Sequence, residues 1–443
     1  MRNNIMEGYR VVLQWMTERV GRIKADNLSV ILFCCMVVGY YYFGYVDVVG
    51  TLSLGVISLT VLFSISYLNY CVRSGSGFSS SHATVSIVLI LLAFWMYVVN
   101  DDRIVQLMQR FCVPIMLIVV VRDVIKYVLQ VKNVLYIIAI LVSISCIVAV
   151  LQAIGLDLFW NLRMLIAEPV VEVRDQIIRR LRAPGLALFS VPLSYQISGI
   201  FPFLLYLNYS TQRSRTRKNI IVLGLSLLLG AMAAKAISGV LAVLVSYFVF
   251  MKLNGYWSFK KLLSTVLIGA VLVICMSFFN QFATRLIKPT ASVSSRIPST
   301  LIATRILLNN PLGIKSTEEI TRIKRYYLAG YENLQVAETI MMAGFHNCLL
   351  DIGISNGWMI LMVYIGLYYC IFRVAYKGRR NSIRGSTDFY FYTAAIAYLC
   401  GYMVQSSTHT AGLTSNDPFD WLMVGVILAY KPSPEFSNNS NDR

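Results

Sequence analysis

Residues 134–155 read VLYIIAILVSISCIVAVLQAIG, an apolar run without a single charged side chain. A helix of about 20 apolar residues is long enough to cross the hydrocarbon core of a bilayer, and this run has that length. Its apolar residues are continuous and do not alternate with polar ones. This pattern indicates a membrane helix and argues against a strand of a membrane barrel.

Similar runs recur along the whole chain. Of its 443 residues, 57% are hydrophobic and 14% are charged, and the mean hydropathy is +0.65. These values lie outside the range of soluble domains. We therefore expect an all-α polytopic membrane protein with about twelve transmembrane helices. The predicted spans lie near residues 28–45, 51–71, 83–99, 111–129, 134–155, 185–208, 219–234, 236–252, 262–280, 354–376, 388–405 and 417–430.

The distribution of Lys and Arg predicts the orientation of the chain. Loops with an excess of these residues stay in the cytoplasm, so the clusters in the N-terminal segment, at 209–218 and at 377–384 place both termini inside. The N-terminal segment is polar and basic, which predicts that the chain has no cleavable signal peptide. The chain then divides into a cytoplasmic segment 1–27, transmembrane helices 28–155, a long outer loop 156–184, helices 185–280, a second long outer loop 281–345, helices 346–430 and a cytoplasmic tail 431–443.

The two long outer loops are rich in arginine, although the outer side of a membrane protein usually carries few basic residues. The first loop holds five Lys or Arg residues and the second holds eight. Long loops are largely exempt from the charge rule, so the predicted orientation stands and the outward cations need another explanation. A phosphate or pyrophosphate carried by a membrane lipid fits best. Nucleic acid fits poorly, because the inner clusters are short and suit lipid headgroups.

Helical patterns predict that both loops are partly folded. Apolar residues at helical spacing in 170–182 indicate an interfacial helix. In the second loop, helices are expected at 298–309, at 316–328 after a capping box, and at 332–342. Together these helices would form a partly folded lid over the outer face of the membrane.

Several cations of the outer face are candidates for binding phosphate. Arginine binds phosphate oxygens through its planar fork and stays charged, and an ionisable group at membrane depth is expected to be functional. The alternative is that these side chains only reach lipid headgroups or water. The candidates are Arg180 and Arg182 with Arg179 in the first loop, Arg296 and Arg305 in the second, and Lys235 in a tight turn between two spans.

His346 is the best candidate for a general base. It stands where the second outer loop enters a span, and Asn347 follows it with an amide that is able to hold a hydroxyl or orient the ring. An imidazole with a pKa of about 6.5 is a competent base near neutral pH. Of the other histidines, we expect His82 to be a bystander on the inner side and His409 to be a solvated loop residue. No cluster has metal-ligand spacing, so we predict neither a metal nor another cofactor.

Four short motifs carry a resemblance to a known family. They are His346-Asn347 with Gly357, Arg182-Ala-Pro-Gly185 before a span, Ser295-Arg296 with Arg305 and Asn310-Pro-Leu-Gly313, and Lys235 with Ser238-Gly239. In their order along the chain, these motifs resemble those of the O-antigen polymerases and O-antigen ligases of bacterial envelopes. The chain departs from the pattern at Lys235, where the family often has arginine, and at Ile360, where the ligases carry a small residue or tyrosine.

The resemblance implies a GT-C-type glycosyltransferase that works without a metal. It would be a multi-pass protein of the bacterial inner membrane, with both long loops and the active site in the periplasm. Its substrates would be glycans on undecaprenyl pyrophosphate, and a chain-length regulator would be a possible partner beside the membrane lipids. A polymerase would transfer the chain onto the next lipid-linked repeat unit, whereas a ligase would transfer it onto lipid A-core. Ile360 and the many outward cations favour the polymerase over the ligase, and a lipid-glycan flippase or transporter is a further alternative.

The predicted orientation is testable by thiol labelling. Leu165→Cys and Ile320→Cys, each in a background without the native cysteines, should react with a membrane-impermeant thiol reagent in intact spheroplasts, because both positions are expected outside. A cysteine within 209–218 serves as the cytoplasmic control. Labelling of the two outer positions only after lysis would overturn the orientation.

Overall fold

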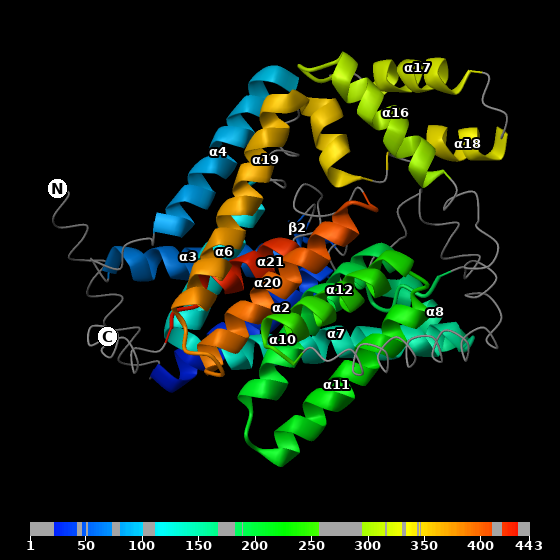
Figure 1. The fold of residues 1–443 in the computed structure, drawn as a ribbon. Helices are drawn as coiled ribbons and strands as arrows, with labels where there is room; N and C mark the ends of the chain where they lie inside the picture. The colour runs from blue at the N-terminus through cyan, green and yellow to red at the C-terminus, as the bar shows by residue number, and fades with distance from the viewer. Residues whose placement is uncertain are drawn as a thin grey trace.

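The computed structural model describes residues 22–41, 47–49, 52–72, 80–100, 111–166, 182–187, 189–256, 295–314, 317–329, 334–342, 345, 347–409 and 419–432. These residues are almost entirely helical (Figure 1). The elements before the first lid helix are α2 (Arg22–Tyr41), β1 (Asp47–Val49), β2 (Leu52–Ser53), α3 (Leu54–Val72), α4 (Ser80–Asn100), α6 (Val113–Asp123), η2 (Val124–Val128), α7 (Val131–Ala153), α8 (Asp157–Ile166), α10 (Ser190–Ser210), α11 (Ser214–Ala233) and α12 (Ile237–Leu253). They are followed by α16 (Arg296–Asn309), α17 (Thr317–Leu328), α18 (Leu334–Met342), α19 (Cys348–Asn381), α20 (Thr387–Ser406) and α21 (Phe419–Ala429).

Four of the described helices are long and apolar enough to cross a membrane. These are α7, α10, α11 and α19. Shorter apolar helices cover Ser29–Gly39, Ile57–Ser66, His82–Phe94, Ile237–Leu253 and Phe419–Ala429. Every predicted span except 262–280, which lies outside the described residues, coincides with a helix. The expectation of a helical membrane protein is therefore confirmed at this level.

The structure corrects several predicted boundaries. The span expected at 185 begins only at Ser190, because Gly185 has a left-handed backbone with φ +62° and residues 182–187 form a separate non-helical segment. The first outer loop contains α8, a helix that was not predicted. A short antiparallel hairpin, β1 with β2, is the one exception to the all-helical class among the described residues.

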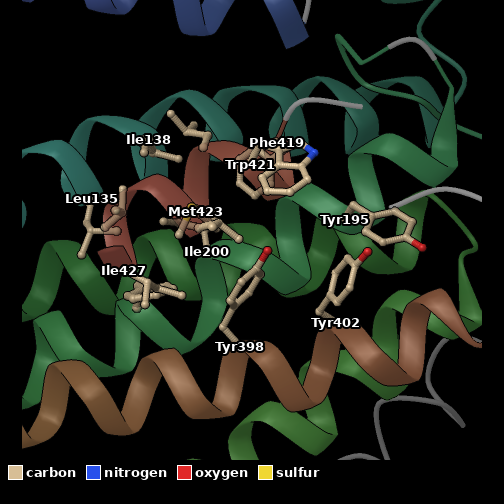
Figure 2. Packing of buried hydrophobic residues seen from close by; sticks show 14 of the residues in the cluster. Leu135, Ile138, Tyr195, Ile200, Tyr398, Tyr402, Phe419, Trp421, Met423 and Ile427 are labelled. Atoms are coloured by element: carbon tan, nitrogen blue, oxygen red, sulfur yellow. The ribbon is translucent and has the colours of Figure 1, made fainter. Parts of the chain in front are cut away.

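The core forms where α10, α12 and α20 pack against one another. Figure 2 shows the centre of this core, in which Phe419 and Trp421 of α21 reach toward α10 and α7, and Tyr398 and Tyr402 rise from α20. All four aromatic residues are buried. Gly199 of α10 allows the close approach of α21, because a Cβ atom there would come within 2.6 Å of the Phe419 ring. These close side-chain contacts fix how α10, α20 and α21 lie relative to one another.

The lid helices α16, α17 and α18 gather at one end of the molecule, near the point where α4 and α19 meet (Figure 1). They share a small core, built on Ile302, Ile306, Leu328 and Ile340, to which Ile354 and Leu361 of α19 also contribute. The predicted lid helices are confirmed: α16 ends at Asn309 as expected, α17 ends at Leu328, and α18 ends at Met342. α16 packs directly on α19, so the lid is joined to the helix bundle.

A sharp bend divides α19 into two helices at Gly357. This glycine has φ 83° and ψ 175°, a conformation that is essentially restricted to glycine. The loop after α16 packs into the bend: the Trp358 amide donates to the Pro311 carbonyl at 2.9 Å, and the Ile314 amide donates to the Ile354 carbonyl at 2.7 Å. A Cβ atom on Gly313 would lie 2.6 Å from the Gly357 nitrogen. Two glycines therefore allow the loop and the bend to meet backbone to backbone.

We expect Gly357→Ala to destabilise the lid junction. The new methyl group would lie 2.7 Å from the Pro311 carbonyl oxygen, and the backbone conformation itself would cost about 1–3 kcal/mol. Gly366→Ala is the matched control in the same helix, because nothing lies within 4 Å of a Cβ atom there. Thermal unfolding in detergent should show a lower midpoint for Gly357→Ala only; equal midpoints would contradict the account of the bend.

Candidate functional site

The segment that carries Arg182 is fixed by hydrogen bonds to α7 and α8. Gln152 binds Gly185 in both directions, with its Nε2 donating to the Gly185 carbonyl at 3.1 Å and its Oε1 accepting from the Gly185 amide at 2.9 Å. Arg163 is only 1% exposed and donates from Nε to the Ala187 carbonyl at 2.8 Å. Arg182 itself is half-buried at the start of this rigid segment. The backbone that carries Arg182 is thus held in place.

Lys235 lies in the turn between α11 and α12. It is the one non-glycine residue with a positive φ, 51°, among the described residues. Nearby, the Ser238 hydroxyl and the His409 Nε2 lie 2.6 Å apart. His409, expected to be a solvated loop residue, is half-buried and bound to this serine. The expectation for His409 was therefore wrong, and the turn has a polar neighbourhood that its local sequence does not reveal.

The two arginines of α16 lie on opposite sides of that helix. Arg296 and Arg305 are separated by about two and a half turns, which turns their side chains in opposite directions. Arg305 is exposed, whereas Arg296 is half-buried and its Nε is enclosed without a hydrogen-bond partner among the described residues. Burial lowers the pKa of the Arg296 guanidinium from its ordinary value. Arg296 is half-buried, so part of its guanidinium remains accessible to an anion, and its planar fork suits phosphate oxygens.

Arg296 lies one turn before the residue through which α16 contacts the segment that leads into α19. Ser299, one turn further along the helix, is buried and donates from its hydroxyl to the Phe345 carbonyl at 3.4 Å. Phe345 directly precedes the predicted base. Asn347 on the other side is the N-cap of α19, where its Oδ1 accepts from the Leu350 amide at 3.1 Å. The structure therefore brings the neighbourhood of Arg296 next to Phe345 and Asn347.

The remaining predicted residues fall in two groups. Arg182 and Lys235 lie on the connections before α10 and before α12, two helices that pack against each other. Gly239 lets these two helices approach closely, because a Cβ atom there would lie 2.7 Å from the Ser194 Cβ. His346, Arg179, Arg180 and most of the predicted interfacial helix 170–182 lie outside the described residues.

Sequence reasoning missed a buried lysine of the lid. Lys324 of α17 is 7% exposed, and burial lowers the pKa of its ammonium group while the Asp351 carboxylate opposes this shift. Its neighbours Arg322 and Arg325 are exposed. The amphipathic pattern of α17 places position 324 on the apolar side, and a lysine there was the signal that could have identified it.

The described cations are suited to binding anions. Arg182 and Lys235 lie next to α10 and α12, and Arg296 lies on α16; guanidinium and ammonium groups of this kind stabilise negative charge on phosphate oxygens. Within the described part of the chain, no group of three His, Cys, Asp or Glu residues could hold a metal ion. No protein-family model matches the chain, and no curated protein sequence matches it.

Proposed function

We propose that this protein is an O-antigen polymerase, a glycosyltransferase of the GT-C type. One observation carries the proposal: segments that resemble separate motifs of that family are in contact. Asn310–Gly313 packs against Gly357, and α16, which carries Arg296, binds the backbone of Phe345 beside His346. Two contacts between residues about 45 positions apart, Ser299 with Phe345 and Gly313 with Gly357, thus join the two ends of α16 to the segment before α19 and to its bend.

In the proposed reaction, a hydroxyl of the acceptor sugar attacks the anomeric carbon of the donor glycan. The bond from this carbon to the pyrophosphate oxygen breaks, and the lipid pyrophosphate leaves with the bonding electrons. Arg296, with Arg182, Arg180, Arg305 and Lys235, stabilises the charge that grows on the leaving group. His346 takes the proton of the attacking hydroxyl, and no metal is needed.

The proposal places about twelve spans in a bacterial inner membrane with the lid in the periplasm. The donor and acceptor would both be glycans on undecaprenyl pyrophosphate, and a chain-length regulator would be a further partner. A ligase is the second candidate, because it uses the same donor and differs in its acceptor. The enclosed Arg296 favours group transfer over the flippase alternative, since transport needs charges along a path through the bundle.

Deletion of the gene separates the three candidates. We expect lipopolysaccharide from the deletion strain to carry core plus one repeat unit, because a missing polymerase leaves ligation intact. A gel of whole-cell lipopolysaccharide is the measurement. Bare core would indicate the ligase if lipid-linked polymer accumulates at the outer face, and the flippase if lipid-linked single units are retained at the inner face.

Removal of Arg296 should impair transfer strongly. Arg296→Ala and Arg182→Ala should each lower the rate by about 10²-fold, the scale of one lost donor to a developing oxyanion. Lysine at either position should rescue only in part, because an ammonium group lacks the planar fork. We expect a smaller loss for Arg305→Ala, since Arg305 lies on the exposed side of α16. Arg325→Ala, an exposed arginine of the same lid, is the control, and a normal rate in Arg296→Ala would remove this residue from the site.

Replacement of His346 tests the predicted base. His346→Ala should lower turnover by about 10²–10⁴-fold with donor binding nearly unchanged, because the arginines hold the donor. Activity of the native protein should fall as the pH drops through the imidazole pKa, about 6.5 if it is unperturbed, since the protonated ring cannot accept a proton. A loss below tenfold, or a flat profile while chemistry limits the rate, would exclude this role.

A further inference from the structure

Phe345, the residue before His346, is held by three different helices. Ser299 of α16 donates to its carbonyl oxygen at 3.4 Å. The Lys324 Nζ of α17 lies 4.4 Å from the centre of its ring, within the range of a cation–π contact. Asp351 of α19 accepts a hydrogen bond from its backbone. Phe345, Ser299 and Lys324 are buried, and Asp351 is half-buried.

Lys324 is the unusual member of this cluster. An amphipathic lid helix normally buries apolar side chains, and burial of an ammonium group is unfavourable unless partners compensate for the lost water. Replacement of a buried charge by an apolar residue of similar size is often neutral or stabilising. Stability of the lid therefore gives no reason for a lysine at this position, where the neighbouring cations Arg322 and Arg325 are exposed.

The other neighbour of His346 is fixed as well. The Asn347 side chain caps α19, and the Asp351 amide donates to the Asn347 carbonyl at 2.9 Å. Asp351 thus contacts both residues that flank His346, through its carboxylate on one side and its amide on the other. Lys324 is electrostatically coupled to this same carboxylate. The backbone on the two sides of His346 is consequently linked to α17 by Lys324, through its contact with the Phe345 ring.

We propose that Lys324 is a positioning residue: its ammonium group contacts the Phe345 ring, attracts the Asp351 carboxylate, and so sets the backbone of the residues on either side of His346. This inference rests on the proposed function, because it gives the lid helix α17 a part in the transfer step. Lys324 does not touch substrate. A displacement of about 1 Å in a reacting group is enough to lower a rate by about 10²-fold, so loss of this one contact should be visible in turnover.

Kinetics of two Lys324 variants give the first test. Lys324→Met keeps an unbranched side chain that is one atom shorter and removes its charge, so kcat should fall by about 10²-fold while KM stays within twofold. Lys324→Arg should recover at least a third of the native kcat, because a guanidinium group also binds an aromatic face and a carboxylate. Arg325→Met, on the exposed side of the same helix, should leave both constants unchanged. Native kcat in Lys324→Met, or no recovery with arginine, would overturn the proposal.

A double variant tests whether Lys324 acts through His346. If it does, Lys324→Met should cause no further loss in a His346→Ala background, because the group it positions is already absent. An additional loss of about 10²-fold in that background would show an independent role and would refute the proposal. Thermal unfolding is measured in parallel, and a fall of the midpoint in Lys324→Met that accounts for its lower activity would equally refute it.

Thiol reactivity gives a readout that needs no transfer activity. In a background without the native cysteines, a His346→Cys thiol should react several-fold faster with a small impermeant reagent once Lys324→Met has loosened its neighbours. Arg325→Met should not change the rate. If native protein shows no glycan transfer, the proposed function fails, while this measurement still decides whether Lys324 positions residue 346. Equal rates with and without Lys324→Met would reject the positioning role itself.

Discussion

The bend of α19 at Gly357 is the constraint on which the position of the lid depends. Two backbone hydrogen bonds, from Trp358 to Pro311 and from Ile314 to Ile354, join the end of α16 to both sides of the bend. Neither bond involves a side chain, so each requires the two backbones to come within about 3 Å. Gly313 and Gly357 make this approach possible. The lid consequently has a fixed position relative to the first turn of α19, and with it relative to Asn347.

The same requirement for close approach explains the glycines of the other motifs. Gly185 packs against Ser145 of α7 and exchanges two hydrogen bonds with Gln152, and Gly239 faces Ser194 where α12 meets α10. In each case a glycine lies within four residues of a predicted cation, Arg182 or Lys235. A cation on a flexible connection loses conformational entropy when it binds an anion, whereas a cation on a connection already fixed by packing loses less. Gly185 and Gly239 therefore allow packing to fix the backbone near Arg182 and Lys235 before an anion binds.

Local sequence predicted most of the helices, because hydropathy and capping residues act over one or two turns. It predicted the ends of α16 and α17 for this reason, through Asn309 and the acidic first turn of α17. It failed wherever a contact joins distant segments. The bond between Ser238 and His409 joins residues 171 positions apart, and the bond from Ser299 to Phe345 joins residues 46 apart. No periodicity encodes such pairs, so neither the burial of His409 nor the role of Lys324 could be read from the chain alone.

Burial divides the cations of the lid into two physical classes. Arg305, Arg322 and Arg325 are exposed, and water stabilises their charge whether or not a substrate is present. Lys324 is buried, and Arg296 is half-buried. Lys324 has an aromatic face and a carboxylate as partners, but the Arg296 Nε is enclosed without a partner among the described residues. An anion that reached Arg296 would regain the stabilisation that burial removed, whereas an anion at Arg325 would only displace water. On this argument, Arg296 gains most from a pyrophosphate and Lys324 is already occupied within the protein.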